Sequence, residues 1–391
     1  MAFALFERSP SSGLGNIRRS YGEPSRNIDW VLMVAVAVQT TIGAVIVYSA
    51  TRPRLLNRGA DPFYFLQRQI IFIIFAAAIL AFIMLLDYGG QLRGNAGLLY
   101  VGTIILLVLV LVAGAATGGA RLSFNLGPVS LQPSEFAKVA TLLLLAGFLA
   151  DDDSDSVSYE RFIQGLMLVG LPAALITVEP DLGSASVLVA CAMGVMLVAG
   201  ARMRNIVFVT SLAIVSVTGA VAAGVVSNYQ LRRITAFFNQ NSDETRLQSI
   251  VYQVRFAKRA VANGGLFGKG YLKGPLTNGA FIPVQSTDFV FSAVGEQFGL
   301  VGCLSVLIIL GVILWRVFRI AQMAKDRFGR FLCAGVFTMI LWQSFQNIGM
   351  TMGLMPVTGV PLPFVSYGGS HTVAFAIMVG IVQNVHMRRF R

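Results

Sequence analysis

A lone carboxylate, Asp288, stands where a polar stretch meets a long apolar run that begins at Phe289 and continues to about Trp315. The run is long enough to cross a bilayer, which takes roughly 20 residues of helix. We therefore expect Asp288 at the mouth of a membrane helix, where water meets lipid. A carboxylate in that position either caps the helix or accepts a proton from a hydroxyl nucleophile within its reach.

The segment that leads to Asp288, residues 227–288, is strongly basic. It carries Arg232, Arg233, Arg246, Arg255, Lys258, Arg259, Lys269 and Lys273. Beside a membrane helix, such a concentration of positive charge suits a phosphate-bearing lipid. Apolar residues recur within it at helical spacing, at Leu247, Ile250, Val251, Val254, Ala257 and Val261. The amphipathic helix that they predict either lies in the membrane surface or packs on the other helices.

Three further motifs place charge at or within apolar runs, where it is costly and therefore a candidate for function. Glu135 and Lys138 lie three residues apart and predict an ion pair that is structural, supports a neighbouring site or takes part in catalysis directly. The turn at Glu179-Pro-Asp181 offers two carboxylates for a cation, or a helix cap from Asp181 alone. Glu296 is rotated by about 80° from Asp288 on an ideal helix and is predicted to face the same cavity.

Composition indicates the class of protein that holds these residues. The 391 residues are 55% hydrophobic and 12% charged, and the mean hydropathy is +0.72. These values exclude an ordinary soluble domain. The formal net charge of +12 then indicates anionic lipids as partners and argues against nucleic acid. The three cysteines lie in apolar runs without spaced partners, so neither a disulfide framework nor a metal cluster is expected.

Apolar run lengths predict an all-α, polytopic membrane protein with about ten transmembrane helices and a long extracytoplasmic loop between spans seven and eight. The predicted spans are 30–50, 64–86, 96–115, 134–150, 161–178, 183–200, 205–226, 289–315, 331–353 and 370–387. The fourth is short and begins with charged residues. No internal repeat is visible.

The distribution of Lys and Arg predicts the orientation. Basic residues concentrate in the N-terminal tail, between Arg316 and Arg330, and at the C-terminus, which places both termini in the cytoplasm. Residues 227–288 are then extracytoplasmic, because long loops cross regardless of charge. Residues 1–29 are expected to form a flexible cytoplasmic tail, followed by a single transmembrane domain over 30–391.

A loop with three prolines, Leu354 to Ser370, precedes the last span and cannot be a regular helix. With it, five motifs in order resemble the SEDS family of cell-wall proteins, and they extend over most of the chain. They are Gln132-Pro-Ser-Glu-x-x-Lys138, Pro180-Asp-Leu-Gly183, Gly264-Gly-Leu-Phe-Gly-Lys-Gly270, Thr287-Asp-Phe289 and Leu362-Pro-Phe-Val-Ser-Tyr-Gly-Gly-Ser370. The lead-in Val357-Thr-Gly-Val-Pro361 is more similar to the cell-elongation branch of that family than to the division branch.

The resemblance implies a peptidoglycan glycosyltransferase of the bacterial cytoplasmic membrane. Such an enzyme polymerises lipid II, releases undecaprenyl pyrophosphate and works with a class B penicillin-binding protein. The resemblance makes Asp288 the general base of an inverting transfer. We expect substrate contacts from Arg121, Gln253, Lys258, Arg259, Lys269 and Ser366, and support from Glu135, Lys138, Asp181, Thr287 and Glu296. A divalent cation, Mg²⁺ or Mn²⁺, is implied by the family and not by any residue pattern here.

Three positions depart from the family pattern. Leu122 and Ser286 stand where the family often has Trp and His, and Gln297 stands where a second Glu often follows Glu296. The last departure weakens a carboxylate-pair role for Glu296, and none removes Asp288. Two other functions stay open at this point, a lipid II flippase and a non-catalytic scaffold for a penicillin-binding protein. In the scaffold, Asp288 would be only a helix cap.

Overall fold

The computed structural model of the chain describes residues 27–117, 120–127, 129–152, 154, 156–222, 228–240 and 248–390. Most of the predicted N-terminal tail lies outside these residues, as do Arg246 and Leu247 of the basic segment. Asp29, which the sequence assigned to the tail, is buried in the bundle. Its carboxylate caps the first long helix by accepting from the Leu32 amide at 3.0 Å and binds the Arg316 guanidinium.

All ten predicted spans are helices within the described residues. They are α2 (Trp30–Asn57), α3 (Tyr64–Leu85), α4 (Ala96–Ala113), α5 (Pro133–Ala150), α6 (Tyr159–Val178), α7 (Leu182–Val198), α8 (Met203–Ala222), α12 (Val290–Met323), α13 (Arg327–Thr351) and α14 (Gly369–Met387). Seven of them, all but α7, α8 and α14, have both the length and the hydropathy to cross a membrane. A short π-helical turn, η2 (Tyr88–Leu92), precedes α4.

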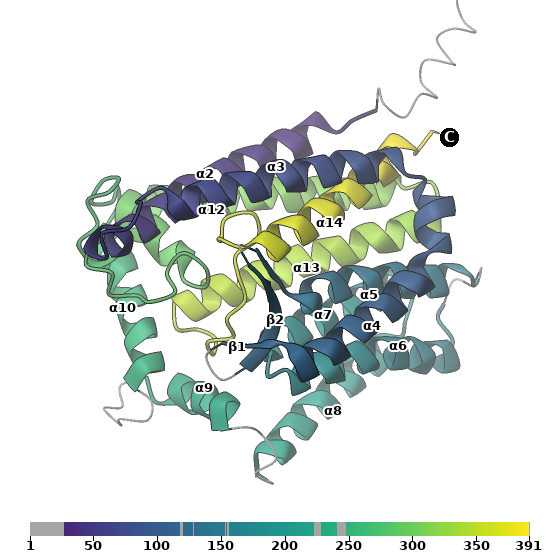
Figure 1. Cartoon of the computed structure of the whole chain (residues 1–391). Helices are drawn as coiled ribbons and strands as arrows, with labels where there is room; N and C mark the ends of the chain where they lie inside the picture. Colours follow the sequence, from purple (N-terminus) through teal and green to yellow (C-terminus); the bar gives the residue numbers. More distant parts are fainter. Residues whose placement is uncertain are drawn as a thin grey trace, which may run out of the picture.

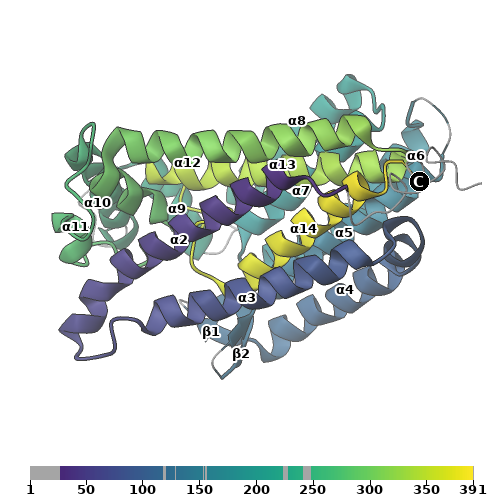
Figure 2. The ribbon, with the colours of Figure 1, turned by 90° about the horizontal axis from the view of Figure 1, so that it is seen from above.

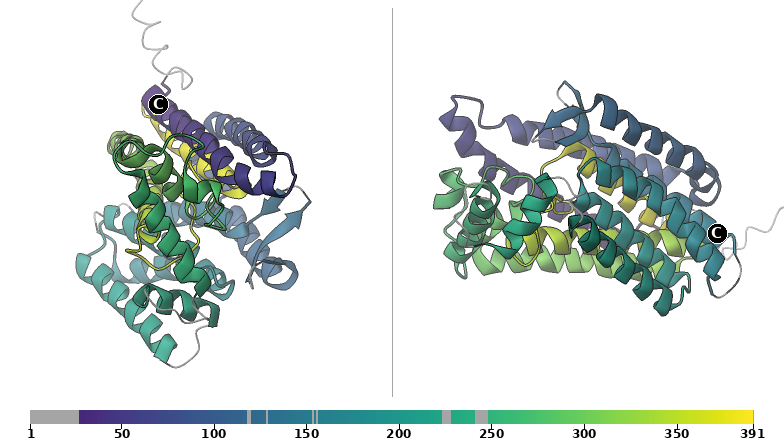
Figure 3. Two further views of the ribbon diagram at one scale, coloured as in Figure 1. Left: turned by 90° about the vertical axis from the view of Figure 1, so that its left-hand side faces the viewer. Right: turned by 90° about the horizontal axis from the view of Figure 1, so that it is seen from below.

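The long helices run side by side, and three shorter helices gather at one end of the bundle (Figures 1 and 2). The shorter helices are α9 (Asn228–Phe238), α10 (Gln248–Gly264) and α11 (Pro275–Asn278). The start of α2 and the end of α14 lie together at the opposite end (Figure 2). The left view in Figure 3 looks at the bundle from the end that carries these shorter helices. The predicted basic segment therefore forms a cap over one end of the bundle.

The centre of the bundle is occupied by α5, the short span with charges at its start. Most of its residues are buried, and it packs against α4, α6, α7, α13 and α14. Small residues let its neighbours approach closely. A Cβ added at Gly335 of α13, for example, would lie 2.2 Å from Leu142 of α5. The charges of the predicted fourth span are thus enclosed by protein rather than exposed to lipid.

A small antiparallel sheet, which the sequence did not predict, connects α4 to α5. It consists of β1 (Ala115–Thr117), β2 (Ala120–Leu126) and β3 (Val129–Leu131), with β2 paired to both neighbours. Ser370, at the start of α14, ties the sheet to the bundle by donating to the Ser130 carbonyl at 2.9 Å. All other regular secondary structure among the described residues is helical, which confirms the all-α prediction.

The amphipathic helix predicted around 247–261 is α10, and its apolar face packs on α12 rather than in lipid. Val251, Val254, Ala257 and Ala260 are buried on that face. The contact is close because two glycines meet, so that a Cβ on Gly264 would lie 1.8 Å from the Gly295 carbonyl oxygen. The structure therefore favours the second of the two sequence interpretations.

Candidate active site

Asp288 lies in the turn just before α12 and does not cap that helix. The N-cap position is taken by Phe289, whose ring has no atom that accepts an amide hydrogen bond. Burial raises the pKa of Asp288, and the Thr287 hydroxyl and the Arg233 guanidinium only partly oppose that rise. A half-buried carboxylate with a raised pKa that serves no helix cap is available for chemistry.

The backbone around Asp288 is held by donors from α13 and from the loop before α14. The carbonyls of three successive residues each accept one hydrogen bond. Ser286 accepts from the Tyr367 amide at 2.9 Å, Thr287 accepts from the Ser366 hydroxyl at 2.5 Å, and Asp288 accepts from the Asn347 side-chain amide at 2.8 Å. The position of the acid is therefore fixed from outside its own helix.

The guanidinium of Arg233 and the carboxylate of Asp288 lie on either side of Gly359. A Cβ placed on Gly359 would lie 3.5 Å from Oδ2 of Asp288 and 3.6 Å from both terminal nitrogens of Arg233. Arg233, in α9, also donates to the Thr358 carbonyl at 2.8 Å, which keeps its guanidinium at this place. Gly359 has a φ of +76°, a conformation that glycine adopts without the steric cost of a side chain. The sequence marked Arg233 only as one of eight basic residues.

Two more carboxylates lie at the same end of the bundle. Asp181 caps α7 by accepting from the Ser184 amide at 3.0 Å, and its charge is close enough to contribute to the raised pKa of Asp288. The side chain of Glu179, just after α6, is almost fully buried. Neither of its oxygens has a hydrogen-bond partner among the described residues. Burial, with a smaller contribution from Asp181, raises the pKa of Glu179 to about 8.

The predicted Glu135–Lys138 pair is present and buried, with Nζ 2.8 Å from the carboxylate. It is joined to the loop that holds Asp288. Gln343 of α13 accepts from Lys138 at 3.4 Å and donates to the Pro361 carbonyl at 3.0 Å. His371, in the first turn of α14, lies 3.6 Å from Glu135 and 3.4 Å from the Leu362 carbonyl. The pair thus supports the neighbouring loop.

Two predicted residues have partners that the sequence did not indicate. Glu296 is fully buried and accepts from the Leu276 amide at 2.7 Å and the Thr277 hydroxyl at 2.6 Å. Its carboxylate therefore faces α11 and holds that short helix. The hydroxyl of Ser366, predicted to contact substrate, accepts from the Leu362 amide at 2.8 Å as well as binding Thr287. Ser366 therefore positions the turn that contains Asp288, whereas Glu296 fixes α11.

The other residues that the sequence predicts to contact substrate make no hydrogen bond or ion pair with Asp288 in the described part of the structure. Lys258 donates to Gln240 at 2.7 Å, and the Arg259 guanidinium lies over the Phe256 ring. The Lys269 side chain is exposed, and Gln253 is half-buried on α10. Arg121 lies on β2 opposite Ala116, and its side chain is outside the described part of the structure.

Comparison with known proteins places this arrangement in a family. Residues 29–390 match the model of the FtsW, RodA and SpoVE proteins, described as cell cycle proteins. The chain belongs to this SEDS family. It is 36% identical to stage V sporulation protein E of Bacillus subtilis over 91% of this chain and 96% of that one. It is 35% identical to a probable peptidoglycan glycosyltransferase FtsW of Geobacter metallireducens over 92% of this chain and 94% of that one.

Solved structures of SEDS proteins share the fold. The crystal structure of the rod shape determining protein RodA of Thermus thermophilus superposes with a TM-score of 0.68 at 29% identity, covering 93% of this chain and 98% of that one. A second solved structure is described as showing structural coordination of polymerization and crosslinking by a peptidoglycan synthase complex. One of its chains superposes with a TM-score of 0.78 at 30% identity, covering 93% of this chain and 99% of that one. Relatives from all three branches match, so the RodA-like role that Val357–Pro361 predicts stays a prediction.

A metal centre needs several His, Cys, Asp or Glu side chains close together. Among the described residues, no group of three or more such side chains is arranged to hold a metal ion. Divalent cations such as Mg²⁺ are commonly held by one or two carboxylates together with substrate phosphates and water. The protein alone therefore does not supply a complete ligand set, and the family-implied cation stays a prediction.

Proposed function

We propose that this SEDS protein polymerises lipid II into glycan strands and that Asp288 is the general base. The single observation that carries the proposal is the placement of Asp288, a half-buried carboxylate that caps no helix, is held by its backbone and is faced by Arg233. A general base must first lie within hydrogen-bonding distance of the hydroxyl, and its pKa must then suit the reaction. The names of the glycosyltransferase relatives support the same reaction class.

The proposed step is an inverting displacement. The 4-hydroxyl of the GlcNAc of an incoming lipid II attacks the anomeric carbon of the growing strand, and a new glycosidic bond forms. The bond from that carbon to the pyrophosphate breaks, undecaprenyl pyrophosphate leaves, and the hydroxyl proton passes to Asp288. Arg233, with Arg121 and Lys269 of the predicted basic set, would stabilise the negative charge on the leaving pyrophosphate.

The proposal includes a place and a partner. Positive residues at the termini support a cytoplasmic location for both ends of the chain and an extracytoplasmic location for Asp288. The relative in the complex of polymerization and crosslinking supports cooperation with a class B penicillin-binding protein. A role in cell elongation follows from the RodA-like segment alone. An added Mg²⁺ or Mn²⁺ ion would assist by neutralising pyrophosphate, and no step above is assigned to it.

The decisive experiment is polymerisation of lipid II by purified protein in liposomes, with and without the partner and with and without a chelator. Asp288→Asn should abolish glycan strands while the protein keeps its melting temperature. Asp61→Asn is the matched control, because Asp61 is an exposed carboxylate in the loop between α2 and α3. Full activity of Asp288→Asn would refute the base assignment. Movement of fluorescent lipid II across the bilayer without polymer would favour the flippase.

A further inference from the structure

Helix α12 is broken near its start, at Gly299. This residue has a φ of +66° and a ψ of −156°, a conformation that glycine adopts without the steric cost of a side chain. The next residues, Leu300 and Val301, have exposed apolar side chains, so the break lies at the edge of the surface that faces lipid. Irregular backbone at such a place is tolerated only where other parts of the protein satisfy it. The glycine-rich segment 264–270 has this role.

Main-chain hydrogen bonds join segment 264–270 to both sides of the break. The donors and acceptors are Lys269 to Glu296 at 2.9 Å, Gly270 to Gln297 at 3.0 Å, Leu300 to Gly265 at 2.9 Å and Val301 to Leu266 at 3.1 Å. The approach is so close that a Cβ on Gly268 would lie 2.1 Å from the Gln297 carbonyl oxygen. The segment and the broken helix therefore form one unit, and the amide of Lys269 is part of it.

The side chain of Gln297 connects this unit to two further parts of the protein. It is almost fully buried, and its Oε1 accepts from the Ser49 hydroxyl of α2 at 2.6 Å and from the Leu272 amide at 3.0 Å. Leu272 has a φ of +61°, a conformation that is rare for residues with a side chain. Its place in the loop therefore depends on hydrogen bonds such as the one from Gln297.

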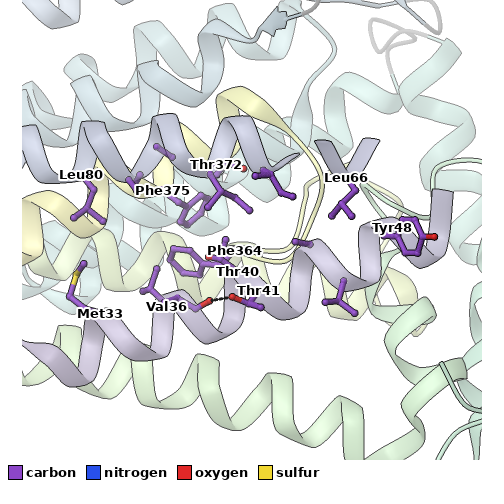
Figure 4. A pocket seen from close by; sticks show the side chains of 18 of the residues that line it. Met33, Val36, Thr40, Thr41, Tyr48, Leu66, Leu80, Phe364, Thr372 and Phe375 are labelled. Atoms are coloured by element: carbon purple, nitrogen blue, oxygen red, sulfur yellow. Dashed lines mark hydrogen bonds between the residues drawn. The ribbon is translucent and has the colours of Figure 1, made fainter. Parts of the chain in front are cut away.

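The loop also contacts α2 close to Ser49. The Tyr271 hydroxyl donates to the Val45 carbonyl of α2 at 3.4 Å. Figure 4 shows Tyr48, the residue before Ser49, at one end of an apolar pocket that Tyr271 also lines. Gln297 therefore binds at the point where α2, α12 and the 266–273 loop meet.

The loop that is held in this way carries two cations. The side chains of Lys269 and Lys273 are exposed, and Lys269 belongs to the set proposed above to stabilise the leaving pyrophosphate. Positive charge stabilises a transition state most effectively when it is already in place before the reaction. Ordering a loop and a long side chain during the reaction would instead cost conformational entropy. A change that loosens the loop should therefore slow the reaction.

We propose that Gln297 is a positioning residue for the reaction and that it acts by fixing the loop that carries Lys269. The inference rests on the proposed function, because it gives a support to the cation that faces the leaving group. Both groups that bind the Gln297 side chain are donors, so the place requires an acceptor. Its Nε2 has no hydrogen-bond partner among the described residues. A carboxylate would therefore serve here too, which accounts for the Glu that the family often has at this position.

The first test measures amide hydrogen exchange in the 266–273 loop of the purified protein in liposomes. Gln297→Leu removes the acceptor, and Gln297→Glu keeps it. Gln322→Leu is the matched control, because Gln322 is an exposed residue near the other end of α12. We expect Gln297→Leu to speed exchange of the loop amides about tenfold, because local opening becomes easier, while the other two variants exchange like the wild type. Melting temperatures report folding, and Gln297→Met replaces Gln297→Leu if that variant does not fold.

The second test measures kcat and KM for lipid II polymerisation with the partner present. Gln297→Leu should lower kcat about tenfold with little change in KM, because the charge that Lys269 stabilises develops in the transition state. Gln297→Glu should keep wild-type rates. In a Lys269→Ala background, Gln297→Leu should cause little further loss, because the two residues then act as one unit.

Three results would overturn the proposal. They are unchanged exchange of the loop amides in Gln297→Leu, a loosened loop with an unchanged kcat, and additive losses from Gln297→Leu and Lys269→Ala. Failure of the proposed function gives a different result. If the wild type forms no polymer, the role of Gln297 in the reaction is refuted with that function, while the exchange measurement still shows whether Gln297 holds the loop.

Discussion

The side-chain amide of Asn347 donates to the main-chain carbonyl of Asp288 at 2.8 Å and to that of Val360 at 2.8 Å. One fully buried residue of α13 thereby joins the peptide of the acid to the loop that brings Gly359 and Arg233 to its carboxylate. The geometry of the candidate site therefore depends on a polar residue that binds the main chain of Asp288 rather than its carboxylate.

Replacement of Asn347 by Ala should weaken both the fold and the site. Two carbonyls lose a donor, and each buried unsatisfied group costs about 1–3 kcal/mol. Denaturant unfolding of the purified protein measures that loss, and lipid II polymerisation should fall further than the folded fraction does. Asn95→Ala is the control, because Asn95 makes a similar 2.8 Å bond to the Gln91 carbonyl at an exposed position. Unaltered polymerisation by folded Asn347→Ala would contradict a positioning role.

The raised pKa of Asp288 predicts the acid limb of the pH–rate profile. A general base must be ionised, so the rate falls as the pH drops through its pKa. Because burial raises that pKa, activity should be lost at a higher pH than an exposed Asp, with a pKa of about 3.9, would give. Thr287→Val removes a hydrogen bond that opposes the rise and should move the limb further towards neutral pH. Identical acid limbs in initial-rate measurements would exclude Asp288 as the titrating base.

The sequence predicted the features that depend on local pattern. Run lengths located the ten helices, helical spacing located α10, and the polar-to-apolar boundary singled out Asp288. These predictions succeed because a membrane-spanning segment must be a long apolar helix, whichever helices it packs against. The position of α10 on the bundle was left open, because an apolar face looks the same whether lipid or protein covers it.

The partners of Asp288 depend on contacts between distant segments, and the sequence did not reveal them. Asn347 is 59 residues away in the chain and is one of several polar residues in the second half of α13, so the sequence does not single it out. Arg233 is one of many basic residues. Glu296 was predicted from helix rotation to face the cavity, but α11 packs against it and takes its carboxylate. A polar residue buried within an apolar span was the available signal, since burial requires it to find a partner.

The buried Glu135–Lys138 pair predicts a strong non-additive effect on stability. Lys138→Met or Glu135→Gln alone leaves an unpaired buried partner, which typically costs about 3–5 kcal/mol. The double variant removes both charges and should be less destabilised than the sum of the two. A double-mutant cycle on unfolding free energies measures the coupling. Additive losses would show that the pair contributes nothing as a pair, and that Gln343 and His371 hold the loop without it.

Glu179 predicts a pH-dependent stability that an isosteric variant removes. Its pKa is about 8 in the folded protein, raised by burial from the ordinary 4.5. Between these two pH values the unfolded chain has lost a proton that the folded chain retains, so stability falls as the pH rises towards 8 and then levels off. Glu179→Gln keeps the shape of the neutral carboxyl and has nothing to ionise.

Melting curves across this pH range should therefore separate the two proteins. Near the ordinary pKa, Glu179→Gln and wild type should melt together, and above the raised pKa the variant should melt at the higher temperature. Glu160→Gln, at an exposed position in the first turn of the same helix, should follow the wild type throughout. Parallel curves for wild type and Glu179→Gln would mean that the carboxylate is ionised and stabilised in the folded protein. A bound cation beside Asp181 would then be the physical explanation to test, by repeating the curves with a chelator.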